Sequence, residues 1–219
     1  MLTGEPQVAG DLQAAPSLLK PLPEETSMVF RPELPIQTER LALRAFTRGD
    51  VDAVFAYRQR DDVAVYLFDE PMSRETCAEI VQVRTTQVGW QDEGDRLVLA
   101  VERRADHAML GEVSLILRNQ VARQGEIGYI LHPQYQGAGF ATEAVRALIG
   151  EGFGQGGLHR IFARCTARNS ASYRLMERVG MRREAHFREH VLVRGVWDDE
   201  LIYALLEDEW TTLANNQPA

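Results

Sequence analysis

Residues 125 to 143 read GEIGYILHPQYQGAGFATE, and the expected fold is built outward from this stretch. Residues 126 to 131 alternate as in an extended strand, whose successive side chains point to opposite faces. Gly137 and Gly139 follow in a short turn, after which Phe140, Ala144 and Leu148 recur at helical spacing. The stretch therefore predicts a strand, a glycine turn and a helix.

A turn of this kind favours an anionic ligand. Glycines let the backbone come close to a ligand, and the first N–H groups of a helix have no partner within the helix. The helix dipole adds a further attraction for negative charge. We therefore expect the phosphates of a ligand at residues 134 to 139, which we call the glycine turn. The alternative is an ordinary strand-to-helix connection whose glycines only relieve steric strain.

The pattern Gln134-x-x-Gly137-x-Gly139 resembles the acetyl-CoA signature of the GCN5-related N-acetyltransferases (GNAT). The resemblance runs from about Gln37 to Trp210. Residues 132–153, 157–189 and 195–210 are similar to the RimJ/RimL branch, which acetylates protein N-termini. The resemblance implies an α/β (α+β) fold with about four helices. Its mixed, mostly antiparallel sheet would have about seven strands and would be splayed at the central parallel pair.

The resemblance also implies acetyl-CoA as co-substrate and no metal. It places the diphosphate on the amides of residues 136 to 141 and the pantetheine between the parted strands. The thioester would then lie near the end of the strand that starts at Gly125. The predicted cofactor-binding residues are Ile130, Leu131, His132, Gln136, Gly137, Ala138, Gly139, Phe140, Ala141, Thr142, Asn169 and Ser172.

The proton donor is predicted on the helix that follows Asn169. Asn169 is a good helix cap, and the resemblance adds a hydrogen bond to pantetheine. Ser172 lies one turn further on, and Asn-x-x-Ser matches the RimJ/RimL pattern, in which the serine protonates the leaving thiolate. Many relatives use a tyrosine instead, but Tyr173 would project about 100° away around the helix. Ser172 is therefore the predicted acid.

Two further groups would act on the reacting amine and thioester. The backbone N–H groups of residues 129 to 131 would polarise the carbonyl. Glu126 is the predicted base, acting through a water, and the alternative is a strand carboxylate paired with an arginine. Cys165 is expected to be an inert packing residue, with contact to the CoA thiol as the second possibility.

The acceptor is predicted from the nucleophile that the site must activate. An α-amine has a pKa of about 7.7 to 8.0 and is partly neutral near pH 7, whereas lysine at about 10.4 is not. Since the sequence shows no strong constellation of bases, a protein or peptide N-terminus is the expected acceptor. A small-molecule amine such as an aminoglycoside or polyamine is the alternative. A non-catalytic, acyl-CoA-binding regulatory module is the second alternative.

The composition bounds the other function classes. The formal charge is −8, which argues against general nucleic-acid binding. No apolar run reaches the roughly 20 residues of a membrane helix, and no signal peptide is recognisable. Cys77 and Cys165 are 88 positions apart, without metal-ligand spacing. We expect a cytoplasmic enzyme without a zinc site, acting as a monomer or a homo-oligomer.

The chain divides by composition. Six of the nine prolines lie in residues 1–35, which we expect to form an N-terminal arm. Residues 36–212 would form the acetyltransferase domain and 213–219 a C-terminal tail. Within the arm, Leu18 with Leu19, and residues 28 to 30, are apolar groups suited to docking on the domain or on a partner subunit.

Overall fold

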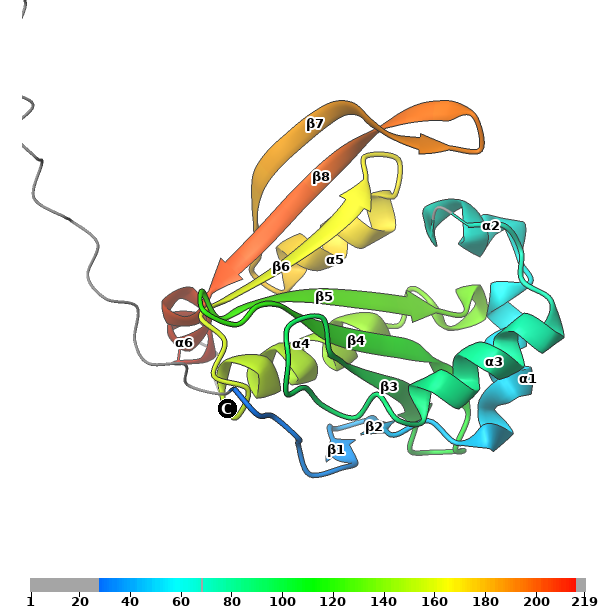
Figure 1. Cartoon of the computed structure of the whole chain (residues 1–219), viewed down its shortest axis with the longest axis horizontal. Helices are drawn as coiled ribbons and strands as arrows, with labels where there is room; N and C mark the ends of the chain where they lie inside the picture. The colour runs from blue at the N-terminus through cyan, green and yellow to red at the C-terminus, as the bar shows by residue number, and fades with distance from the viewer. Residues whose placement is uncertain (1–27, 68, 216–219) are drawn as a thin grey trace, which may run out of the picture.

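The computed structural model describes residues 28 to 67 and 69 to 215. Within these residues eight strands form one sheet in the order β1-β2-β3-β4-β5-β6-β8-β7 (Figure 1). The strands are β1 (Ile36–Gln37), β2 (Leu41–Arg44), β3 (Arg96–Arg103), β4 (Met109–Asn119), β5 (Gln124–Leu131), β6 (Arg160–Thr166), β7 (Arg182–Val193) and β8 (Val196–Leu206).

Six α-helices accompany the sheet in the described part of the chain. They are α1 (Val51–Arg58), α2 (Asp61–Ala64), α3 (Arg74–Arg84), α4 (Phe140–Phe153), α5 (Ser170–Arg178) and α6 (Glu207–Asn215). Three 3-10 turns join them, namely η1 (Arg48–Asp50), η2 (Val65–Leu67) and η3 (Pro133–Tyr135). The mixed α/β architecture was predicted from the sequence. The two-residue strand β1 and the helices α2 and α6 account for the excess over the expected seven strands and four helices.

The centre of the sheet is its one parallel pair. β5 and β6 pair in register from Gln124 with Arg160 to Glu126 with Phe162, and all other described neighbours are antiparallel. The ladder ends there, although β5 continues to Leu131 and β6 to Thr166. The two strands therefore part toward their C-terminal ends, as Figure 1 shows, and the expected splay is confirmed.

The two faces of the sheet carry separate cores. One face packs against α4 and α5 in the larger cluster, which includes Leu115, Ile127 and Leu148. The other face packs Val98 and Ala100 of β3 against α1 and α3 in a smaller cluster. Strand alternation produces this division, because residues one apart on a strand face opposite sides. The parted strands therefore lie between two helical layers.

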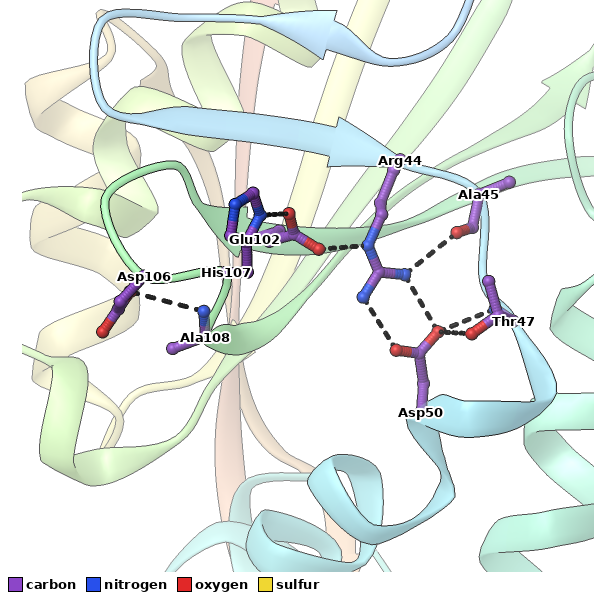
Figure 2. A network of polar contacts seen from close by, with 8 residues as sticks. All are labelled: Arg44, Ala45, Thr47, Asp50, Glu102, Asp106, His107 and Ala108. Atoms are coloured by element: carbon purple, nitrogen blue, oxygen red, sulfur yellow. Dashed lines mark hydrogen bonds and ion pairs between the residues drawn. The ribbon is translucent and has the colours of Figure 1, made fainter.

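A polar network joins helix α1 to the sheet (Figure 2). Arg44, at the end of β2, donates to both carboxylate oxygens of Asp50, at 2.9 and 2.8 Å, and to Glu102 of β3 at 2.5 Å. Asp50 also accepts from the Thr47 backbone N–H at 2.7 Å. Because Asp50 directly precedes α1, this network sets where α1 begins relative to the sheet.

Both ends of the described chain pack on the domain. Phe30 exchanges two backbone hydrogen bonds of 2.9 Å with Trp90 and is only 3% exposed. Part of the predicted arm thus docks on the body, whereas Leu18 and Leu19 lie outside the described residues. At the other end α6 crosses the expected boundary at residue 212, and Leu213 packs against the core next to Gly180. In the described range no helix has the length and apolarity needed to cross a bilayer.

Candidate active site

The glycine turn leads into α4 with its backbone donors free. Gly137 and Gly139 have φ angles of 81° and 82°, a region that favours glycine. The first helical hydrogen bond at this end runs from the Glu143 N–H to the Gly139 carbonyl. Within the described part of the chain, the N–H groups of residues 137 to 142 have no hydrogen-bond acceptor. This is the arrangement that a diphosphate requires.

Gln136 is not among the free amides of the glycine turn. The Gln136 N–H is donated to the Pro133 carbonyl at 3.1 Å, so the prediction that this amide binds the diphosphate is wrong. The Gln136 side chain instead donates to the Leu131 carbonyl at 3.2 Å, which ties the turn to the end of β5.

The glycine turn is braced from a distant strand. The Arg40 guanidinium donates to the Ala138 carbonyl at 3.0 Å and pairs with Glu143 of α4 at 2.7 Å. It also lies over the Phe140 ring, 4.6 Å from the centroid. The sequence gives no sign of this role, because the partners of Arg40 are about a hundred positions away. The free amides are thus held in place before any ligand binds.

A cavity of about 1010 Å³ runs through the gap between β5 and β6. Its lining includes side chains from both faces of the sheet. Val98 and Ser114 are register partners on the face of α1 and α3, whereas Ile127 and Cys165 belong to the core on the α4 face. The cavity therefore joins the two faces of the sheet. A ligand that enters beside α4 can meet a second ligand that enters from the side of α1 and α3.

Most of the predicted cofactor-binding residues meet at this cavity. The lining contains Ile130, Leu131, Gln136, Gly137, Gly139, Phe140, Ala141, Thr142, Asn169 and Ser172, but neither His132 nor Ala138. His132 is engaged locally, since its Nδ1 accepts from the Gln134 N–H at 3.2 Å. The His132 N–H is bonded to Leu110 on the β4 side. Because N–H directions alternate along a strand, those of Tyr129 and Leu131 point toward the gap.

Ser172 lies at the cavity wall and is paired with a tyrosine. Its Oγ is 2.8 Å from the Tyr129 hydroxyl, which also donates to the Ser172 carbonyl at 3.1 Å. Burial raises the pKa of Tyr129 well above its usual value, so this hydroxyl stays protonated. Asn169 Oδ1 accepts from the Ser172 N–H at 3.1 Å, which confirms the predicted cap. Tyr173 packs against the core and is absent from the cavity lining.

Cys165 shares this part of the cavity. Burial raises the pKa of the Cys165 thiol to about 11, and an interaction with the Ser172 side chain only partly opposes that shift. The thiol is therefore protonated at neutral pH, as expected for a packing residue.

The structure does not bring Glu126 to the cavity. Its carboxylate accepts from Arg118 at 2.6 Å and from Arg164 at 3.1 Å, and it is not part of the lining. This is the alternative interpretation, a strand carboxylate paired with arginines. Asp199 likewise has a structural role, since it bonds His186 at 2.6 Å and the Glu189 N–H at 2.9 Å within the β7–β8 hairpin.

A buried charge cluster on the other face was missed. Glu112 of β4 is 4% exposed and accepts from the Tyr57 hydroxyl at 2.9 Å, from Arg58 at 2.6 Å and from Arg84 at 2.8 Å. Glu112, Arg58 and Arg84 line the cavity. A glutamate inside the apolar run of residues 110 to 117 was the available signal, because a buried carboxylate needs partners. Within the described ranges no group of acidic, histidine and cysteine side chains is suited to a metal ion.

Comparisons with known proteins agree with this geometry. A family model described as an acetyltransferase (GNAT) domain matches residues 40–182. YnaD of Bacillus subtilis, an uncharacterized N-acetyltransferase, is 33% identical over 80% of this chain and 98% of its own. A GNAT-family acetyltransferase structure from Bacillus anthracis superposes with a TM-score of 0.71 and 31% identity, covering 78% of this chain and 98% of the other.

Two more distant relatives have named acceptors. A spermidine N(1)-acetyltransferase of Vibrio cholerae is 26% identical over 78% of this chain and 95% of its own. The alanine N-acetyltransferase of ribosomal protein uS5 from Escherichia coli is 32% identical over 39% of this chain and 44% of its own. The chain therefore belongs to the GNAT family and is an N-acetyltransferase that takes its acetyl group from acetyl-CoA.

Proposed function

We propose that the chain acetylates the N-terminal α-amine of a protein or peptide. The observation that supports this acceptor is the state of the cavity's carboxylates. Among the described residues only Asp62 and Glu112 line the cavity with carboxylates, and both are bonded to arginines. A polyamine would need free carboxylates, and a lysine would need a strong base. An α-amine needs neither, because on the order of a tenth of it is neutral near pH 7.

The chain's own groups divide the chemistry between them. The amides of residues 137 to 142 bind the diphosphate, and the gap between β5 and β6 receives the pantetheine as an added strand. The N–H groups of Tyr129 and Leu131 polarise the thioester carbonyl. Acetyl-CoA supplies the activated acetyl group, to which the neutral amine adds as the carbon–sulfur bond breaks. The amine proton leaves to water.

Ser172 donates a proton to the leaving sulfur. Tyr129 acts as a positioning residue, because its hydroxyl donates to the Ser172 carbonyl and remains within hydrogen-bond distance of Oγ. The raised pKa of Tyr129 keeps its hydroxyl protonated while it holds the serine, and Ser172 regains a proton from the water that takes up the amine proton. Glu126 takes no part, since two guanidinium groups occupy its carboxylate.

The test is acetyl transfer to a panel of amines. Release of the CoA thiol is measured with peptides that have a free N-terminus, with the same peptides N-formylated but carrying a lysine, with spermidine and with an aminoglycoside. We expect release only with free N-termini, and mass spectrometry of the product should place the acetyl group on the α-nitrogen. Faster transfer to spermidine or the aminoglycoside would overturn the proposal. Binding of acetyl-CoA without release for every acceptor would identify a regulatory module.

A further inference from the structure

The cavity has a distinct compartment on the α1 and α3 face of the sheet, which we call the acceptor chamber. Its sheet wall consists of residues whose register puts them on that face, including Arg96, Val98, Glu112 and Ser114. Arg58 of α1 and Arg84 of α3 line it as well. The glycine turn and Ser172 border the cavity beside α4 and α5. Acetyl-CoA would therefore occupy that end of the cavity, and the acceptor amine the acceptor chamber.

The acceptor chamber has more positive than negative charge. Arg58 and Arg84 share one carboxylate, that of Glu112, so two positive charges and one negative charge leave +1. Arg96, an exposed residue at the start of β3 that lines the cavity, adds a second positive charge, because it enters none of the ion pairs of the described residues. The other charged lining residues of this face are already paired, Asp62 with Arg60 and Arg164 with Glu126 and Glu200.

The phosphates of CoA do not account for this charge. The free amides that suit them lie at the start of α4, beyond the opposite face of the sheet. Neighbouring strands are about 4.8 Å apart, so β3, which carries Arg96, lies roughly 10 Å from β5 across the sheet. The positive charge of the acceptor chamber therefore favours an acidic group on the acceptor.

We propose that the acceptor is an anionic peptide, with an acidic side chain close behind the α-amine that is acetylated. Its carboxylate pairs with Arg96, which lines the cavity. This inference rests on the proposed function, since it takes the α-amine as the reacting group. Arg96 is level with Ile116 and Glu126, so its backbone lies roughly 13 Å along the strands and roughly 10 Å across them from Ile130, near the end of β5. The arginine side chain spans part of this distance, and an extended peptide advances about 3.3 to 3.6 Å per residue, so we expect the acidic residue at position three or later.

Three matched peptides test the proposal. They share one sequence with a free N-terminal alanine and differ only in glutamate, glutamine or lysine at position three. We expect kcat/KM to fall in that order, by tenfold or more from glutamate to lysine, mainly through KM. Added salt should narrow the difference, because it screens charge pairs that solvent reaches.

Arg96→Glu should reverse the order, so that the lysine peptide becomes the best substrate. Arg183→Glu is the matched control, since Arg183 is exposed on β7, lies outside the cavity lining and undergoes the same change in charge. Both variants should retain the wild-type Kd for acetyl-CoA, which shows that the donor site is intact.

The outcomes separate the inference from the proposed function. Equal kcat/KM for the three peptides, or the same response of Arg96→Glu and Arg183→Glu, would overturn the anionic acceptor while leaving α-amine acetylation standing. If spermidine is acetylated and no peptide is, both proposals fail. A preference for glutamate that Arg96→Glu reverses supports both.

Discussion

Replacing Glu112 by glutamine tests whether the buried charge cluster stabilises the domain. The Glu112 side chain is 6% exposed, and the side chains of its partners Arg58 and Arg84 are 10% and 11% exposed. Glutamine preserves the shape and one acceptor oxygen but removes the negative charge. Two guanidinium groups then remain next to each other in a site that water barely reaches, and Tyr57 keeps a neutral partner at best.

The expected loss follows from that desolvation. Breaking a buried ion pair by removing one partner costs about 3 to 5 kcal/mol. We expect the lower end, about 3 kcal/mol, because the glutamine oxygen still accepts one hydrogen bond. Domains of ordinary stability have about 5 to 15 kcal/mol in total, so the change is large but the variant should still fold. With a urea m-value of about 2 kcal/mol/M, the unfolding midpoint should fall by about 1.5 M.

The assay is urea unfolding at pH 7, followed by circular dichroism and by tryptophan fluorescence. The control is Asp52→Asn, which removes a carboxylate from an exposed pair. The Asp52 and Arg74 side chains are 78% and 56% exposed, and such pairs contribute about 1 kcal/mol or less. A midpoint for Glu112→Gln that drops no further than that of Asp52→Asn would refute the reasoning that the cluster is desolvated and mutually dependent.

Three further predictions concern the donor site and the network in Figure 2. Gly137→Val should raise the Kd for CoA, measured by calorimetry, at least tenfold, because valine is strained at a φ of 81°. The control Gly94→Val, at φ 96° in a turn outside the cavity, should leave the Kd unchanged. Equal Kd values for the two variants would refute the role of the glycine turn in CoA binding. Ser172→Ala should lower kcat by about 10²- to 10⁴-fold with little change in CoA affinity, and a normal kcat would discard the serine as acid. Burial alone would raise the pKa of Asp50, but hydrogen bonds from Arg44 and Thr47 outweigh it and lower the pKa overall. The stabilisation that ionised Asp50 provides is therefore complete above its unfolded-state pKa of about 3.9 and is lost as the pH falls through its lower folded-state pKa. The difference in free energy of unfolding between wild type and Asp50→Asn should accordingly disappear in acid. A difference that does not depend on pH would contradict this assignment.

Local patterns explain why part of the site was predictable. The strand, the glycine turn and helix α4 depend on contacts between residues a few positions apart and on backbone conformations that favour glycine. The Asn169 cap of α5 spans three residues and follows from helical geometry, whereas the choice of Ser172 rested on the resemblance to the RimJ/RimL pattern. The parallel partner β6 follows from a strand reached through a helix.

Other parts of the site could not be predicted, because they depend on pairings between residues far apart in the sequence. Glu126 was predicted as a base because it lies on the central strand, close to the expected position of the thioester. Its partners Arg118 and Arg164 come from the two neighbouring strands, and only the assembled sheet shows them. The same holds for Tyr129, whose hydroxyl meets a serine 43 positions later.

The sequence by itself therefore determined most of the elements and the amides that suit a diphosphate, since each depends on short-range spacing and backbone conformation. The splay of the sheet was expected only from the resemblance to the family, because it is a property of two strands that are far apart in the sequence. Only the tertiary structure decided which charges are paired and which are free. Arg40 reaches Glu143 across 103 positions, and Glu112 is shared by arginines 54 and 28 positions away. Electrostatic energies depend on distance and burial in space, and a linear sequence specifies neither until the strands and helices have packed.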